Sequence, residues 1–171
     1  MMRTLRAGLM LIALLTTAAA PSTADQPGSA VPDQTLRVRI VDGSAVLWRT
    51  SAGLQTMLGR PVRSRPVPPG DFRLPEGGIW REYRGQGARI DVDFEQDLST
   101  TVMIEFADRP SAPRTYEEAL EAVNLPYDPR PDFATRASQE WHVRGVYVRV
   151  VASPPGLERI DRIILSVHPL P

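Results

Sequence analysis

Two stretches of alternating apolar and polar residues constrain the fold of this chain more than any other feature. The first runs from Ile79 to Phe106. Its central segment, Ile90 to Glu95, is apolar at every second position, which is the period of a strand with one buried face. The second stretch runs from Trp141 to Val167 and again holds short strand-like segments separated by turn residues. Together they predict two antiparallel β-meanders.

A short helix precedes each meander. Thr50 or Ser51 can cap the first helix, and Gly59 supplies the left-handed residue that commonly follows a helix end. The second helix begins with a capping box at residues 115–118 and ends near Asn124. The second helix carries an apolar stripe of Tyr116, Ala119, Leu120 and Val123, which we expect to pack on the sheet.

The order of these elements predicts an α+β fold. It consists of two degenerate helix-plus-meander repeats, at about residues 50–109 and 115–168, that form a sheet with two short helices. Apolar alternation from Leu36, followed by Asp42-Gly43 and Ala45 to Trp48, predicts an N-terminal hairpin with a type I′ turn. The segment from Pro61 to Gly78 is rich in proline and glycine and shows no periodicity, so we expect a long loop there.

The N-terminal residues have the pattern of a secretory signal peptide. Arg3 and Arg6 precede an apolar run from Ala7 to Ala19 that is too short to span a bilayer, and small residues follow it. We expect a signal peptide at residues 1–24, a flexible lead at 25–34 and a single domain at 35–171. The mature protein is expected in the periplasm or outside the cell, without a membrane span.

Charge and cysteine content exclude several classes of function. The chain has 20 basic and 20 acidic residues and no cysteine. Loss of the signal peptide removes two arginines and leaves the chain slightly acidic, which argues against nucleic acid as a partner. Without cysteine there is no disulfide, no thiolate chemistry and no lipidated cysteine. We expect no cofactor.

The carboxylates Asp91, Asp93, Glu95 and Asp97 resemble part of a calcium-binding loop in their spacing. Such a loop requires a glycine at its sixth position and a glutamate at its twelfth, where this chain has Gln96 and Val102. We therefore predict no metal site and interpret these residues as the solvated face of a strand.

No motif for a nucleophile, a metal set or a phosphate loop is present, which predicts a protein that is not an enzyme. We expect an exported module that binds another envelope or secreted protein. Aromatic residues and arginines anchor interfaces most often. The candidates on the predicted strands are Arg81, Tyr83, Tyr147 and Arg149, whereas Trp80 and Trp141 are expected in the core.

Three alternatives stay open. One is a structural or stress-related envelope protein without a specific partner. Another is a small-ligand-binding protein, because a curved sheet under two helices can form an apolar groove. The third is a hydrolase or metal-dependent enzyme that uses His142 as a base with Asp91 or Asp93 on a neighbouring strand.

The element order resembles that of the secreted tandem-repeat β-lactamase inhibitor proteins and of related outer-membrane assembly lipoproteins. The resemblance covers Ser51 to Val167 and includes Leu58-Gly59-Arg60-Pro61, Trp80 and Trp141. It implies a helix-plus-meander fold given twice and a protein partner. The inhibitors carry disulfides and the lipoproteins a lipidated cysteine, and this chain has neither.

Overall fold

The computed structural model describes residues 40–85, 87–106, 112–153 and 159–170. They belong to the unit Thr35–Pro171 and form two helices and eight strands. In chain order the elements are α1 (Ser51–Leu58), β1 (Arg63–Val67), β2 (Gly78–Gly85), β3 (Ala88–Glu95), β4 (Leu98–Glu105), α2 (Tyr116–Ala122), β5 (Phe133–Ala134), β6 (Ser138–Val143), β7 (Val146–Ala152) and β8 (Ile160–Ser166).

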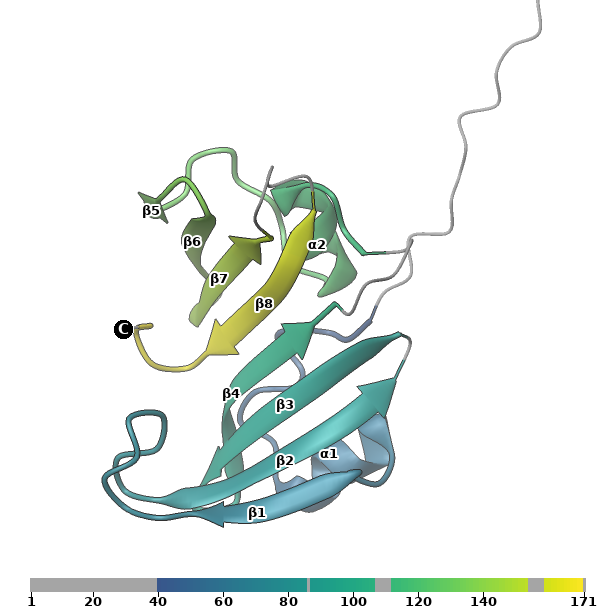
Figure 1. Ribbon diagram of the computed structural model, residues 1–171, viewed down its shortest axis with the longest axis vertical. Coiled ribbons are helices and arrows are strands. Elements are labelled where there is room, and N and C mark those ends of the chain that lie inside the picture. The colour runs from purple at the N-terminus through teal and green to yellow at the C-terminus, as the bar shows by residue number, and fades with distance from the viewer. Residues whose placement is uncertain (1–39, 86, 107–111, 154–158, 171) are drawn as a thin grey trace, which may run out of the picture. The chain divides into compact units, whose positions relative to one another are not determined.

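The eight strands form one antiparallel sheet in the order β1-β2-β3-β4-β8-β7-β6-β5 (Figure 1). The two predicted meanders are β2-β3-β4 and β6-β7-β8, and each gains an edge strand, β1 or β5. The meanders join where β4 pairs with β8, in a register that sets Val102 opposite Leu165 and Ile104 opposite Ile163. The predicted α+β class is confirmed, and the relation of the halves as repeats stays a prediction.

Threonine caps begin both helices, as the sequence predicts. Thr50 Oγ1 accepts a hydrogen bond from the Gly53 amide (3.1 Å), and Thr115 Oγ1 accepts one from the Glu118 amide (3.1 Å). Gly59 follows α1 with φ +83°, a left-handed conformation in which glycine is unstrained. These local contacts satisfy backbone groups that a helix end leaves without partners.

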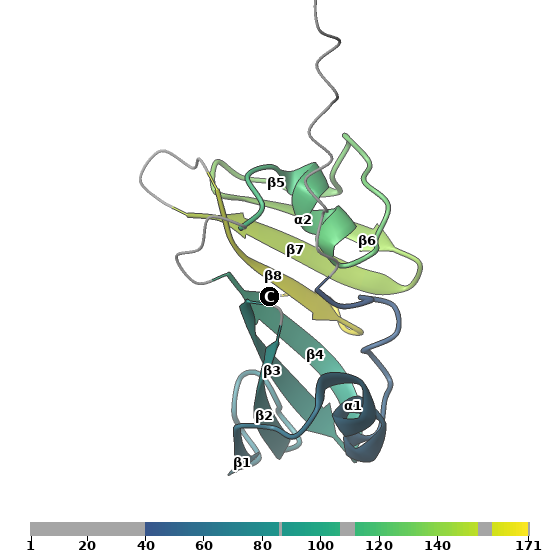
Figure 2. The same ribbon diagram turned by 90° about the vertical axis from the view of Figure 1, so that its right-hand side faces the viewer.

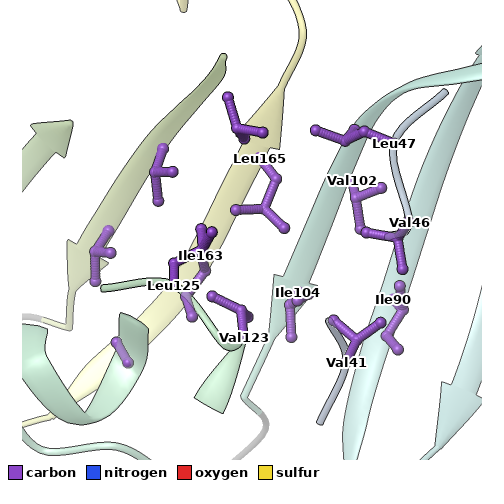
Figure 3. Close-up of a cluster of buried hydrophobic side chains, with 14 of the residues drawn as sticks. Val41, Val46, Leu47, Ile90, Val102, Ile104, Val123, Leu125, Ile163 and Leu165 are labelled. Atoms are coloured by element: carbon purple, nitrogen blue, oxygen red, sulfur yellow. The ribbon is translucent and has the colours of Figure 1, made fainter. Parts of the chain in front are cut away.

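The hydrophobic core lies between the two helices and one face of the sheet (Figure 2). Leu54 of α1 and Leu120 of α2 are fully buried in the same cluster. The core continues across the β4–β8 pairing, where Ile104 and Ile163 are neighbours (Figure 3). The side chains that form it there are Val41, Val46, Leu47, Ile90, Val102, Ile104, Val123, Leu125, Ile163 and Leu165. Burial of this apolar surface is the main force that holds the two meanders together.

The predicted N-terminal hairpin is wrong within the described residues. Residues 40–49 contain no strand, and residues 36–39 lie outside the described part. Asp42 Oδ1 accepts hydrogen bonds from the amides of Ser44 (3.1 Å) and Ala45 (3.2 Å), which produces a tight turn instead. The Gly43 amide donates to Val123 O (2.7 Å), and a Cβ on Gly43 would lie 3.0 Å from that oxygen. Glycine is therefore required for close contact with the end of α2, not for a hairpin turn.

The predicted loop from Pro61 to Gly78 is also partly wrong, because its first third forms the edge strand β1. Four of the five residues of β1 are exposed and only Val67 is buried. A strand that is exposed on both faces has no apolar alternation, so periodicity alone does not detect it. Pro66 and two arginines on this edge disfavour pairing with a further strand.

Among the described residues, neither helix is long and apolar enough to cross a bilayer.

Candidate functional site

The sheet face opposite the helices is the candidate site, and we call it the helix-free face. Cross-strand pairing identifies its residues, since paired residues point to the same side of a sheet. The central ones are Arg63 and Arg65 on β1, Trp80, Glu82 and Arg84 on β2, Arg89, Asp91 and Asp93 on β3, Thr101, Met103 and Glu105 on β4, Arg162, Ile164 and Ser166 on β8, Tyr147 and Arg149 on β7, and Glu140 and His142 on β6.

The four predicted binding residues do not share one surface. Tyr147 and Arg149 lie on the helix-free face, where both are partly exposed. Tyr83 points to the opposite face, pairs with Ile90 and is fully buried in the core. Arg81 points to the same side as Tyr83, with its guanidinium carbon 5.3 Å from the centre of the Phe94 ring. The expectation of a common surface is therefore wrong for Arg81 and Tyr83, and Tyr147 and Arg149 stay candidates.

The β6–β8 half of this face carries a group that we call the aromatic–arginine patch, consisting of Glu140, His142, Tyr147, Arg149 and Ile164. The rings of His142 and Tyr147 stack with centroids 4.4 Å apart and planes inclined by 11°. Arg149 Nε donates to Glu140 Oε1 (2.6 Å), and Arg149 pairs across the strands with Ile164. Stacking and ion pairing hold these partly exposed side chains in defined orientations.

The structure separates the three residues of the enzyme hypothesis. Asp91 and Asp93 lie on β3 and His142 lies on β6, with β4, β8 and β7 between them. Strands in a sheet are spaced about 4.8 Å apart, so His142 is about 19 Å from either carboxylate across the sheet. A hydrogen bond between base and acid requires about 3 Å. This particular set does not form a catalytic site.

The β1–β3 half of the face carries arginines above buried carboxylates, a group that we call the arginine layer. It comprises Arg63, Arg84 and Arg89 over Glu82 and Asp91. Glu82 lies 3.2 Å from Arg84 Nε and 3.9 Å from Nε of both Arg63 and Arg89. Arg89 also donates to Asp91 Oδ2 (2.7 Å) and to Glu105 Oε2 (3.3 Å). The carboxylates are satisfied by cations that stay in contact with water.

Asp91 and Asp93 are not on a solvated face, which corrects the sequence prediction. Each is only 5% exposed. Burial raises the pKa of Asp91, and the hydrogen bond from Arg89 opposes this effect. The hydrogen bond to Asp91 in turn raises the pKa of Arg89.

Asp93 lacks the close hydrogen-bonded cation that Asp91 has. Burial raises its pKa to about 6. Its Oδ1 atom is buried without a hydrogen-bond partner, and the nearest cation is Arg73 Nη1 at 3.9 Å. A carboxylate in this environment is half protonated near pH 6 rather than near pH 4.

The segment between β1 and β2 covers Asp93. Leu74 is fully buried against Trp80 and Val67, in a small cluster separate from the main core. Hydrogen bonds within the segment, such as Gly70 N to Pro75 O (2.8 Å) and Gly77 N to Leu74 O (2.8 Å), hold its shape. Phe72 at its tip is 83% exposed. The segment therefore presents an aromatic side chain on an anchored backbone.

The sequence contained a signal for the arginine layer that our interpretation missed. Glu82 precedes Arg84 by two positions, and Arg89 precedes Asp91 by two. Residues two apart on a strand share a face, so opposite charges at this spacing predict ion pairs within one strand. We find no group of three or more His, Cys, Asp or Glu side chains that could hold a metal ion among the described residues.

Comparison with known proteins yields fold likenesses only. No protein-family model matches the chain, and no curated protein matches it. A cysteine-rich secretory protein from Staphylococcus aureus matches with a TM-score of 0.50 and 10% identity over 75% of this chain and 47% of that one. An extracellular protein containing an SCP domain from Bacillus anthracis matches with a TM-score of 0.47 and 12% identity, over 86% and 50% of the two chains.

A DUF4309 family protein from Bacillus subtilis matches with a TM-score of 0.40 and 14% identity, over 68% of this chain and 77% of that one. The chain thus spans about half the length of the first two proteins. None of the three is a β-lactamase inhibitor protein, so that resemblance stays a prediction.

Proposed function

We propose that this protein is a non-catalytic binding module that docks another protein on its helix-free face. The observation that carries the proposal is the aromatic–arginine patch, whose side chains are ordered and partly exposed while both helices lie on the other side of the sheet. Stacked aromatic rings and an oriented arginine lose little conformational entropy when a partner binds, which favours affinity.

The partner belongs to the cell envelope or to the medium. This part of the proposal depends on the signal-peptide pattern at residues 1–24. The likeness to a Staphylococcus aureus protein described as secretory agrees with it, although that likeness concerns the fold. The resemblance to tandem-repeat inhibitors suggests that the partner is itself an enzyme or an assembly component.

Capture of partners from envelope extract tests the proposal. The bait is the chain from Asp25 onward, and the test variant carries Tyr147→Ala and Arg149→Ala. The control variant carries Gln55→Ala and Met57→Ala, two exposed positions on α1 on the opposite side of the sheet. Thermal melting checks that both variants are folded.

We expect a protein that is retained by the wild type and by the α1 variant and is lost from the Tyr147/Arg149 variant. Loss from both variants, or from neither, would contradict docking at the aromatic–arginine patch. A folded wild type that retains no protein would overturn the proposed function itself.

A further inference from the structure

We infer that the arginine layer binds an acidic segment of the protein partner, rich in Asp and Glu. The inference rests on the proposed function in one respect, since it names the chemistry of that partner. It concerns the β1–β3 half of the helix-free face, whereas the proposed function depends on the β6–β8 half.

The positive and negative side chains of the arginine layer are exposed to very different degrees. The side chains of Arg63 and Arg84 are 73% and 68% exposed, whereas that of Glu82, to which both are paired, is 3% exposed. A docking partner therefore contacts the guanidinium groups and cannot reach the carboxylate beneath them. Arg65, which lies over the Trp80 ring at 5.1 Å, adds a further exposed guanidinium to this surface.

The guanidinium groups of Arg84 and Arg89 retain N–H donors beyond those that bind the buried acids. A guanidinium has five N–H donors in a planar fork. Arg84 uses its Nε–H on Glu82, and Arg89 uses one donor from each of its three nitrogens on Asp91 and Glu105. The remaining N–H groups can donate to further carboxylates, and the buried acids already orient the arginine side chains that carry them. Arginine is suited to this task because its fork matches the two oxygens of a carboxylate.

The size and charge of the arginine layer fit a short acidic polypeptide better than a nucleic acid. Its three arginines come from three adjacent strands, a width of about 10 Å. Glu82, Asp91 and Glu105 equal the three arginines in number, but Glu82 and Asp91 are buried, so the exposed charge is mainly that of the guanidinium groups. Nucleic acid is held mainly through many Lys and Arg contacts to phosphates, of which these arginines can supply only a few.

Two neighbouring features restrict how the segment docks. Pro66 lies in β1 at the edge of the sheet, and a proline there disfavours addition of a partner strand. The acidic segment therefore lies on the face rather than along the edge. Phe72, on the segment that covers Asp93, offers an exposed aromatic ring for an apolar residue that flanks the acids.

Fluorescence anisotropy with a labelled oligoglutamate peptide tests the inference on the chain from Asp25 onward. The test variant is Arg63→Gln with Arg84→Gln. The matched control is Arg130→Gln with Arg136→Gln, which removes the same charge from exposed positions between α2 and β6. Arg89 is left unchanged because it also neutralises the buried Asp91. Unlabelled polyphosphate is used as the competitor.

We expect the wild type and the control to bind oligoglutamate, with affinity that falls as salt is added, and the test variant to bind about tenfold more weakly. Absence of binding, an equal loss in the control, or equally effective competition by polyphosphate would overturn the inference. The experiments distinguish failure of this inference from failure of the proposed function. Suppose that a captured partner is lost from the Tyr147/Arg149 variant but is retained by the Arg63/Arg84 variant. That result contradicts binding of an acidic segment and leaves the proposed function intact.

Discussion

Strands β3 and β7 have the same alternating sequence pattern, but their polar residues differ in burial. In β3 the apolar Ile90 and Val92 alternate with Asp91 and Asp93, and all four are buried. In β7 the apolar Val146, Val148 and Val150 are buried, while the residues between them stay partly exposed. The strands occupy similar positions, each one strand away from the central β4–β8 pair.

The difference comes from what covers each strand. Arg89 lies over Asp91, and the segment between β1 and β2 covers Asp93. On β7, the side chains of Tyr147 and Arg149 contact neighbours within the sheet, His142 and Glu140. Alternation thus determines the direction of a side chain, and distant parts of the chain determine whether that direction leads to solvent.

The largest loss of stability is expected when Trp80 is truncated, because Leu74 of the segment that covers Asp93 packs against it. Trp80→Ala should lower the free energy of unfolding by about 3 kcal/mol, because Trp80 packs against buried Leu74 and Val67. Tyr147→Ala should lower it by less than about 1 kcal/mol, because its ring is already partly exposed. Urea unfolding of both variants measures the two values. Equal losses would mean that the faces of β3 and β7 are covered to the same degree.

Substitution of Asp93, by contrast, is expected to raise the free energy of unfolding. Its folded pKa of about 6 lies above the ordinary aspartate pKa of 3.8, so the folded state binds more protons between these pH values. The stability of the wild type should therefore fall as pH rises from 4 to 6 and then level off. Asp93→Asn removes this dependence and should stabilise the protein by about 2 kcal/mol at pH 7, with little effect at pH 4.

Chemical denaturation at several pH values measures this gain, with Glu76→Gln as the control. Glu76 is an exposed acid on the same covering segment, and its loss removes the same charge. If Asp93→Asn has no pH-dependent gain beyond that of the control, then Asp93 is better solvated than its burial indicates.

The smallest change in stability is expected for two arginines of the helix-free face, Arg89 and Arg149, each of which pairs with a carboxylate. Arg89→Gln leaves the buried Asp91 without its closest cation and should cost about 1–2 kcal/mol. Arg149→Gln should cost less than about 1 kcal/mol, because Glu140 is partly exposed and water can replace the pair. Thermal or urea unfolding compares them. A greater loss for Arg149→Gln would reverse the contrast between the two halves of the face.

Local chemistry made much of this fold predictable. Side-chain oxygens at Thr50 and Thr115 predicted both helix starts, because capping involves residues only three apart. The alternation in β7 placed Tyr147 and Arg149 together on one face. In β2, however, Ile79 and Tyr83 point to one face of the sheet and Trp80 points to the other. Large apolar or aromatic residues therefore occur on both faces, and the pattern does not say which face is buried. The sequence interpretation therefore assigned Tyr83 to the surface.

The covered acids could not be predicted from their own strand. The burial of Asp93 depends on Arg73 and Leu74 in the segment between β1 and β2. The sequence around these two residues shows no periodic pattern of apolar positions. The role of Gly43 likewise depends on contact with Val123, which is 80 residues further along the chain. Such contacts arise from packing between distant segments, and local propensity contains no information about them.

The central claim is that a protein partner covers the helix-free face, and oxidative footprinting of the complex with a captured partner tests it most directly. We predict that Tyr147, His142 and Met103 react more slowly in the complex than in the free protein, whereas the exposed Met57 of α1 reacts at the same rate in both. Slower reaction at Met57, with Tyr147 and His142 unchanged, would place the partner on the helical side and contradict the account.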